Sequence, residues 1–558
     1  MTKVSFQSLP RNYLFLFLVV FTLLAVVVRF YQFGQIPLAT YWDETAILAE
    51  AKSVAEIGKD IHGNHWLQAI YPSYGDFKLP VYIWFASLSV KLLGASVFSL
   101  RLPSLLAGVG TIIFSGLLAT RLFNTKKEKS WWLGLSVAFV MALSPWAFHF
   151  SRVAFEGQLG QFFLLIAVFI ALNSWKKTGR GSLFIAQVFA ALATYSYYSV
   201  IFVWPIVFLT LGVFLMVRQK NKKLKTIAIK FFCLLLALAI YGLLLLPLMK
   251  SPLYNNMNQL RLSTTSVLSI TDYVLESNSL REEVGNTFFS RFFYHRYLLL
   301  LKELAKNYTD FFSFNTLFIQ GDQNLRHSTG VHGLFLLPFF PFFIWGIFSL
   351  FKDKKFITVV LVIWWILGVL PAAVPTETPH ALRSLNALVP ITIIIGYGVF
   401  QSIQRIMKIE NQQKIIAASA FALIALSVTS YWHYYFKVYP EISKIWWQYG
   451  FTPAAKQICQ LKNNFGQVWL ELDDDRFFVW LLAFCDFEQD ARDKTLYDGY
   501  NLKQIDNILI KQFVGNASVA IEQQNLFVTN KIGDDQQLAV RPNLILNYGP
   551  SDTYYFYW

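Results

Sequence analysis

Long apolar runs separated by short basic loops constrain the fold of this chain more than any other feature. Several runs approach the roughly 20 residues that an α-helix needs to cross a bilayer. Of the 558 residues, 55% are hydrophobic and only 15% are charged. These values are typical of a polytopic membrane protein rather than of a soluble globule. The runs predict eleven spans, at 12–32, 101–121, 131–150, 157–174, 182–197, 198–217, 227–249, 331–351, 356–374, 384–405 and 414–435.

The basic residues indicate how these spans are oriented. The net charge is +15, but the cations gather in short loops between apolar runs, so they report topology rather than a nucleic-acid-binding surface. The short loops 151–156 and 375–383, which lie on the opposite side of the membrane from the basic loops, contain one arginine each, Arg152 and Arg383, and no lysine. The positive-inside rule therefore places the other loops in the cytoplasm. Seventeen basic residues lie in those loops, at 123–130, 175–181, 218–226, 352–355 and 405–414.

One further apolar run, 80–94, is short for a span. If it crossed the membrane, every later loop would change sides and the basic loops would face outward. We therefore predict that it lies at the interface or enters the membrane without crossing. The N-terminus is then cytoplasmic, and eleven crossings place the C-terminus outside the cell membrane. Large outward segments are expected at 33–100 and 250–330, both within a transmembrane domain over 1–435, and at 436–558.

The segment 436–558 is expected to form a small α/β or α+β domain outside the membrane. Its stretch 467–472 alternates apolar and polar residues, which predicts a strand. Two of the three cysteines, Cys459 and Cys485, lie in this segment, where oxidation would allow them to pair. The sequence leaves that pairing open. Cys233 lies inside an apolar run, which favours a packing role.

An adjacent pair of carboxylates, Asp43 and Glu44, follows the first predicted span. Neighbouring charges near a membrane are costly unless they are paired. On an outward loop, such a pair can deprotonate an acceptor or bind a cation. The alternative is a structural one, in which both residues cap a surface helix that begins at Thr45.

Further polar residues are expected at the same membrane depth. Cations there suit a lipid-linked phosphate, and carboxylates suit proton removal from a hydroxyl or amine. The candidates are Lys78, Arg152, Glu156, Arg326, His327, Glu377, His380 and Arg383.

Each of these candidates also has a structural interpretation. Lys78 could extend to lipid headgroups, and this role is favoured for Arg101. Arg152 and Glu156 have the spacing of a helical ion pair. The i, i+3 and i+6 spacing of a third group would place an ion-pair cluster on one helix face; that group is Glu377, His380 and Arg383.

Sequence motifs give little indication of a cofactor. No His-x-x-x-His or Cys-x-x-Cys motif supports a zinc site, and no P-loop or Gly-x-Gly-x-x-Gly motif supports a bound nucleotide. A divalent ion held by Asp43, Glu44 and Glu156 stays an alternative to a site that works without metal.

The order of four motifs resembles that of the GT-C membrane glycosyltransferases. The resemblance is to the glycosyltransferase family 39-like branch, which includes protein O-mannosyltransferases and lipid A aminoarabinose transferases, and it covers roughly residues 10–400. Aminoarabinose transferases often have Lys-Pro-Pro where this chain has Lys78-Leu79-Pro80. The matching motifs are Asp43-Glu44, Gly75 to Pro80, Arg101-Leu102-Pro103-Ser104 and Ser151 to Glu156.

The resemblance implies a mainly α, GT-C transmembrane bundle and a sugar donor linked to polyprenyl phosphate, bound from the outer side. Asp43 would be the base, supported by Glu44, with Glu156 as a second acid near the acceptor. Lys78, Arg326 and His327 would hold the donor phosphate. Apart from the resemblance, their charge and their place on the outer face make Arg152, Glu377, His380 and Arg383 candidates for contacts with substrate. Because the chain has neither a Trp-Trp-Asp motif nor a recognisable β-trefoil insertion, transfer of a single sugar is favoured.

Two other functions compete with glycosyl transfer. A flippase or transporter of lipid-linked sugars would explain the spans, but it needs ionisable groups at the membrane midplane, and the predicted spans hold few. A surface assembly protein would use its outer tail for binding. The sugar, the acceptor and the oligomeric state are not determined by the sequence.

Overall fold

The computed structural model describes residues 11–123, 127–174, 180–217, 224–264, 267–268, 270–406, 411–488, 495–511, 517–530, 541–548 and 552–558. Much of the predicted cytoplasmic loops therefore lies outside the described residues. The chain divides into two compact units. Unit 1 comprises Met1–Tyr31 and Ser104–Tyr439, and unit 2 comprises Gln32–Pro103 and Pro440–Trp558. The first predicted outer loop thus belongs to the same compact unit as the C-terminal segment.

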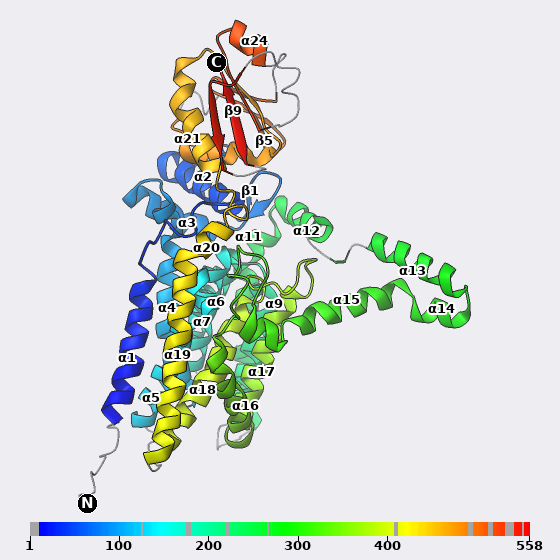
Figure 1. Ribbon diagram of the computed structural model, residues 1–558. Coiled ribbons are helices and arrows are strands. Elements are labelled where there is room, and N and C mark those ends of the chain that lie inside the picture. The colour runs from blue at the N-terminus through cyan, green and yellow to red at the C-terminus, as the bar shows by residue number, and fades with distance from the viewer. Residues whose placement is uncertain are drawn as a thin grey trace, which may run out of the picture. The chain divides into compact units, whose positions relative to one another are not determined.

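Unit 1 consists mainly of long apolar helices that run side by side (Figure 1). A helix overlaps each of the eleven predicted spans. The helices are α1 (Arg11–Val28), α4 (Val97–Phe123), α5 (Lys127–Leu143), α7 (Glu156–Ser174), α8 (Arg180–Ser196), α9 (Val200–Val217), α10 (Leu224–Leu244), α16 (Phe340–Asp353), α17 (Lys355–Val369), α18 (Leu388–Ile406) and α19 (Asn411–Lys437).

Hydropathy confirms a multi-pass membrane protein. Within the described residues, six helices have the length and apolar composition needed to cross a bilayer, and shorter apolar helices accompany them. One of the shorter helices is α3 (Pro80–Leu93), where the sequence predicted an element that does not cross. The total of eleven crossings stays a prediction.

Glycine allows close helix packing within unit 1. A Cβ atom on Gly398 of α18 would overlap the carbonyl oxygen of Phe342 on α16, and one on Gly346 of α16 would overlap that of Ile394 on α18. Two helices can approach this closely only where side chains are absent, which is a common means of association in membranes.

Short elements connect the long helices of unit 1. After α10 come α11 (Leu246–Met249), α12 (Leu253–Thr264), α13 (Ile270–Val284), α14 (Phe288–Phe293) and α15 (Arg296–Asp310). Helices α12 to α15 fall in the second predicted outer segment, 250–330, whereas α11 lies at the end of the predicted span 227–249. The remaining connections include α6 (Pro145–Phe150), the π-helical turn η1 (Asn315–Ile319), and the 3₁₀ turns η2 (Leu337–Phe339), η3 (Leu370–Ala372) and η4 (Leu385–Ala387).

Unit 2 begins with two helices and a short hairpin. Helix α2 (Trp42–Ile57) ends at Gly58, whose φ of +69° suits a residue without a Cβ atom. Strands β1 (Tyr71–Pro72) and β2 (Phe77–Lys78) pair antiparallel and lead into α3.

The C-terminal part of unit 2 is a seven-stranded mixed sheet in the order β4-β5-β6-β3-β7-β9-β8 (Figure 1). Strand β3 pairs in parallel with β6 and β7, and the other pairs are antiparallel. This confirms the predicted small α/β domain and the strand at 467–472. The strands are β3 (Val468–Glu471), β4 (Leu496–Asp498), β5 (Asn501–Ile505), β6 (Ile508–Ile510), β7 (Leu526–Thr529), β8 (Leu544–Asn547) and β9 (Thr553–Tyr557), and the helices are α20 (Tyr439–Ile442), α21 (Phe451–Leu461), α22 (Phe478–Phe484) and α24 (Ala517–Glu522).

Both faces of this sheet are covered. On β3, Val468 and Leu470 face a core built with α21 and α22, whereas Trp469 faces a smaller core with α24. This alternation follows from the period of two in a strand. Ala46 of α2 belongs to the larger core, so the first outer loop contributes to the hydrophobic core of the C-terminal domain.

A disulfide joins Cys459 of α21 to Cys485 at the end of α22, which settles the pairing that the sequence left open. Cys485 is fully buried in the larger core. The bond closes a loop with a sequence separation of 26 residues.

Replacing both cysteines with serine, as Cys459→Ser and Cys485→Ser, is expected to lower the free energy of unfolding by about 3 kcal/mol, because a cross-link of this length restricts the unfolded chain. The apparent melting temperature of the purified protein in detergent measures the effect. Cys233→Ser is the matched control, since Cys233 is a free cysteine on α10. An unchanged melting temperature in the double variant would contradict the prediction.

Candidate functional site

The Asp43-Glu44 pair lies in the first turn of α2. The helix begins at Trp42, and Tyr41 occupies the N-cap position in an extended conformation. The alternative of a helix that starts at Thr45 with the two acids as caps is therefore wrong. Carboxylates in the first turn are stabilised by the helix dipole, which favours negative charge there.

Glu44 is completely buried in an ion pair with Arg101. The Arg101 Nε and Nη2 atoms donate to the two carboxylate oxygens of Glu44 at 3.0 and 2.7 Å. Arg101 also donates to the carbonyl oxygens of Pro37 and Ala39, and its guanidinium lies over the ring of Trp447. The expectation that Arg101 extends to headgroups is thus wrong. This bidentate pair positions the start of α2.

Asp43 is the more accessible acid, with 24% of its side chain exposed. Lys78 Nζ and the Tyr74 hydroxyl both donate to Asp43 Oδ1, and Lys78 also pairs with Asp76 at 2.9 Å. Burial raises the pKa of Asp43, but the charge of Lys78 and hydrogen bonds from Lys78, Tyr74 and Tyr41 outweigh it and lower the pKa to about 2. Asp43 is therefore ionised at neutral pH, and Lys78 is a partner of this carboxylate.

The C-terminal domain supplies a residue that sequence reasoning missed. The Arg476 guanidinium lies 3.7 Å from the centroid of the Trp42 ring, and its Nε donates to Asp474. The pKa of Arg476 is raised overall, because the effects of Asp474 and, more weakly, of Tyr74 and Asp43 outweigh the lowering by burial. A second cation thus stands near Asp43. Because it follows Asp43 by more than 400 residues, only the folded structure identifies it.

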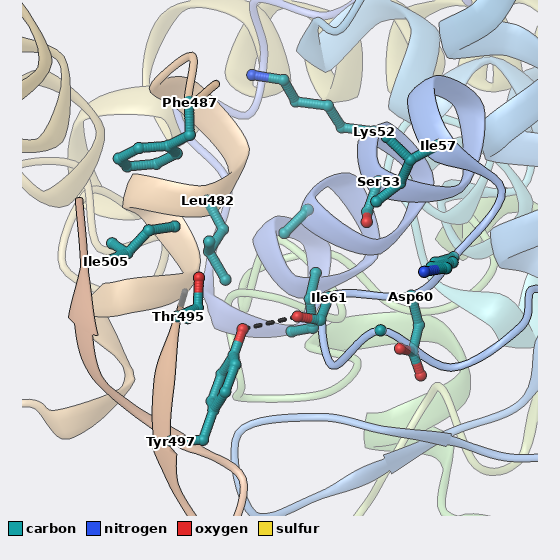
Figure 2. Close-up of a pocket in the computed structure, with 13 residues that line it drawn as sticks. Lys52, Ser53, Ile57, Asp60, Ile61, Leu482, Phe487, Thr495, Tyr497 and Ile505 are labelled. Carbon is teal, nitrogen blue, oxygen red and sulfur yellow. Dashed lines mark hydrogen bonds between the residues drawn. The ribbon is translucent and has the colours of Figure 1, made fainter. Parts of the chain in front are cut away.

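A small cavity of about 70 Å³ lies between α2 and strands of the C-terminal domain (Figure 2). Lys52, Asp60 and Tyr497 are among its lining residues, and the Tyr497 hydroxyl donates to the Ile61 carbonyl at 2.7 Å. Next to it, Glu50 is completely buried, and burial together with Asp60 raises its pKa well above the usual value. No residue predicted for the site lines this cavity.

In unit 1, three buried side chains converge: Asp322, His327 and His380. His327 Nδ1 lies 3.0 Å from Asp322 Oδ2, and the two imidazole rings stack with centroids 4.5 Å apart. Asp322 also accepts the N–H groups of Asn324 and Ala381, each at 2.8 Å. Burial raises the pKa of Asp322, and burial followed by the neighbouring His327 lowers that of His380 well below its usual value. Asp322 was not among the predicted residues, although it follows Gly321 at a turn.

Two arginines adjoin these three side chains. The charges of Arg383 and Arg326 contribute to the lowered pKa of His380. Arg326 Nε donates to Asn324 Oδ1 at 3.1 Å, and the Asn324 amide donates to Glu377 Oε2 at 3.0 Å. The structure therefore brings five predicted residues to one place in unit 1, namely Arg326, His327, Glu377, His380 and Arg383.

The predicted helix face for Glu377, His380 and Arg383 is wrong. Residues 375–383 form turns, and the next helical turn is η4. Pro375 and Pro379 explain this, because proline lacks the N–H group that a helix needs and disfavours helical geometry in the preceding residue.

Arg152 and Glu156 do not form the predicted pair within one helix. Arg152 lies in the turn between α6 and α7, whereas Glu156 is the first residue of α7. Arg152 is fully buried, donates to the Arg29 carbonyl at 2.7 Å and lies over the ring of Phe436. These contacts give Arg152 a packing role.

Among the described residues, Asp322, His327 and His380 form the group with the spacing to hold a metal ion. Imidazole nitrogens are common metal ligands, but the adjacent guanidiniums of Arg326 and Arg383 oppose a further positive charge. Glu44 uses both oxygens on Arg101, which removes it from the predicted set of metal ligands. Two guanidiniums, of Arg326 and Arg383, and two carboxylates, of Asp322 and Glu377, thus surround the stacked imidazoles.

Comparisons with known proteins support the resemblance found in the sequence. Residues 78–245 match the family described as dolichyl-phosphate-mannose-protein mannosyltransferase. The search of curated proteins gave no match.

Two solved structures of ArnT share the fold of this chain, and a third structure, of an oligosaccharyltransferase, is less similar. ArnT from Cupriavidus metallidurans in the apo state is 10% identical, with a TM-score of 0.53, and the alignment covers 96% of this chain and 97% of that chain. ArnT bound to undecaprenyl phosphate is 12% identical, with the same TM-score and coverage. The archaeal oligosaccharyltransferase AglB from Archaeoglobus fulgidus, in complex with an inhibitory peptide and a dolichol-phosphate, is 14% identical over 94% of this chain and 70% of that chain, with a TM-score of 0.48.

The family match and the shared fold agree with each other. The chain shares the GT-C fold of ArnT, as its motifs predicted, and residues 78–245 within it match the protein mannosyltransferase family.

Removing one partner of the buried pair is expected to destabilise the protein more than removing both. Arg101→Met leaves the Glu44 charge unpaired, which costs roughly 3–5 kcal/mol, whereas the double variant Glu44→Leu, Arg101→Met recovers much of this loss. Apparent melting temperatures of the single and double variants test the coupling. Glu441→Gln, which disrupts the exposed pair with Lys444, is the control and should change little. Simple additivity of the two single changes would contradict a coupled pair.

Proposed function

We propose that this protein transfers a single sugar from a polyprenyl-phosphate-linked donor to an acceptor on the extracytoplasmic face of the cell membrane. The observation that carries the proposal is the ionised, partly exposed Asp43 carboxylate at the start of α2, held by Lys78. The family match and the fold shared with ArnT bound to undecaprenyl phosphate support this donor class. The acceptor is a lipid, glycan or protein that presents a hydroxyl or amine.

The proposed reaction is an inverting displacement. The acceptor oxygen or nitrogen attacks the anomeric carbon, its proton passes to Asp43, and the bond from that carbon to the phosphate oxygen breaks. The polyprenyl phosphate leaves with the bonding electron pair. A positioned carboxylate can accelerate such a step by about 10²–10⁴-fold.

Lys78 connects donor binding to the basicity of Asp43. With a pKa of about 2, Asp43 is a weak base while Lys78 remains on it. A donor phosphate that draws Lys78 away would remove the positive charge that does most to lower this pKa, and the carboxylate would become a stronger base. We therefore assign Lys78 to the donor phosphate and Asp43 to the acceptor. Glu44, through its pair with Arg101, positions Asp43 without contacting substrate.

The cluster in unit 1 is proposed to bind an anionic part of the substrates. Arg326 and Arg383 supply charge, and His327 and His380 supply ring nitrogens for hydrogen bonds to phosphate oxygens. Glu377 positions Asn324, which in turn positions Arg326. Glu156, at the first turn of α7, keeps the predicted role of a second acid near the acceptor.

The outward orientation is supported by two independent features. The positive-inside rule directs the basic loops to the cytoplasm and the C-terminus outward. The Cys459–Cys485 disulfide lies in the C-terminal domain, and such bonds persist in oxidising compartments.

Asp43→Asn is expected to reduce transfer by about 10²-fold or more, because the amide cannot accept the proton. Membranes supplied with a radiolabelled polyprenyl-phosphate sugar measure transfer, and the melting temperature measures folding. Asp486→Asn is the control, since Asp486 is 99% exposed in the same unit. Full transfer by a folded Asp43→Asn variant would overturn the proposed role of Asp43.

Arg326→Gln is expected to raise the KM for the donor roughly tenfold or more, since a hydrogen bond to a charged group contributes about 1.5–3 kcal/mol. Initial rates over a range of donor concentrations separate KM from kcat. Lys352→Gln at the exposed end of α16 removes a positive charge elsewhere in unit 1 and serves as the control. A normal KM for the donor in Arg326→Gln would exclude the unit 1 cluster from donor binding.

A further inference from the structure

Helices α13, α14 and α15 form an arm of unit 1 that extends away from the long helices (Figure 1). Helix α13 packs against α15, and the Ser277 hydroxyl donates to the Tyr294 carbonyl, which joins α13 to the segment between α14 and α15. We call residues 270–310 the arm and residues 285–302 its tip. The arm has no part in the proposed transfer chemistry.

The base of the arm is attached to the end of an apolar helix. The Tyr308 hydroxyl donates to the Ile366 carbonyl of α17 at 3.1 Å, and the buried Asn307 amide donates to the Pro375 carbonyl at 3.2 Å. Helix α17 belongs to a segment, Lys355–Ala372, with the length and hydropathy of a membrane span. The attachment near the last turns of α17 therefore places the base of the arm at the depth of a membrane surface.

The direction of α15 extends that depth to the tip. Figure 1 shows α15 running across the direction of α16 and α17 rather than along it. A helix that runs across the spanning helices lies along the membrane rather than through it. Its 15 residues reach about 22 Å at 1.5 Å per residue. The tip is thus held beside the bundle, at the level of the bilayer surface.

The tip exposes an unusual concentration of aromatic side chains. On α14, the exposed fractions are 79% for Phe288, 69% for Phe289, 59% for Phe292 and 61% for Phe293. The uncharged polar residue of the same helix, Ser290, is instead buried in a capping box with Thr287, while Arg291 is exposed. The helix therefore exposes its four phenylalanines together with Arg291, and so large an exposed apolar patch is unusual for a surface that only water covers.

The charges of the tip identify the surface that would cover these rings. Residues 285–302 contain Arg291, Arg296 and Lys302 but no aspartate or glutamate. Aromatic rings interleaved with cations suit the boundary between acyl chains and anionic headgroups. Helix α13 differs, because it carries four acidic residues: Asp272, Glu276, Glu282 and Glu283.

We propose that the tip is a membrane anchor that inserts the rings of α14 into the outer leaflet while Arg291 and Arg296 contact lipid phosphates. The partner is the bilayer surface, with a preference for anionic phospholipids. The inference rests on the exposed rings, the charge of the tip and the attachment to α17, and it holds whichever sugar or acceptor the enzyme uses.

Site-specific fluorescence in lipid nanodiscs tests the anchor. In a Cys233→Ser background, Phe289→Cys is labelled with an environment-sensitive fluorophore, and Glu276→Cys on α13 is labelled as the matched control. The label at position 289 should be quenched by lipids that carry a nitroxide near the headgroup and protected from aqueous iodide. The label at position 276 should show the opposite pattern. The melting temperature of each labelled protein verifies that it is folded.

Two further variants separate lipid from protein as the covering surface. Arg291→Gln with Arg296→Gln should weaken lipid quenching at position 289 in discs that contain phosphatidylglycerol and change little in discs of phosphatidylcholine alone. Free access of iodide to position 289 in both disc types would overturn the anchor. Protection from iodide without lipid quenching would also overturn it, because it would mean that a protein surface, such as a second copy of this chain, covers the rings.

Discussion

The buried Glu44–Arg101 pair is the interaction on which the arrangement of unit 2 depends. Arg101 donates to both oxygens of Glu44 and to two backbone carbonyls before α2, so one guanidinium holds the helix start, the preceding loop and α4 together. Because both side chains are fully buried, neither charge can be removed alone without a large desolvation penalty. Asp43 precedes Glu44 in the first turn of α2, so the ion pair that fixes Glu44 also fixes the backbone position of Asp43.

Accessible and inaccessible charges have different roles in this molecule. Glu44 is buried in an ion pair with Arg101 and Arg152 is buried among aromatic rings, whereas Asp43 retains exposed surface and is paired with the long side chain of Lys78. In unit 1, the imidazoles of His327 and His380 lie beside the guanidiniums of Arg326 and Arg383, and the proposed function assigns this cluster to a phosphate. These differences in burial, more than residue type, distinguish candidates for chemistry from candidates for packing.

Local and topological features were predictable because they depend on short-range sequence patterns. Apolar runs placed a helix at every predicted span, and the alternation at 467–472 identified β3. The motif order indicated the GT-C fold, and the same membrane depth was predicted for Arg326, His327 and His380, which lie together in the structure. Two predictions were wrong for different reasons. Arginine occurs both at lipid headgroups and in buried ion pairs, and Arg101 was assigned to headgroups although it is buried. Pro375 and Pro379 prevent the helix that was expected at Glu377.

The sequence by itself determined the membrane class, the position of the helices and the set of polar residues from which a site could be built, since hydropathy and charge act residue by residue. Only the tertiary structure decided which carboxylate pairs with which cation, that Arg476 stands near Asp43, that Cys459 bonds to Cys485, and that the phenylalanines of α14 face outward. These facts depend on contacts between distant segments, whose geometry follows from packing and from the burial of charge, and no local pattern encodes it.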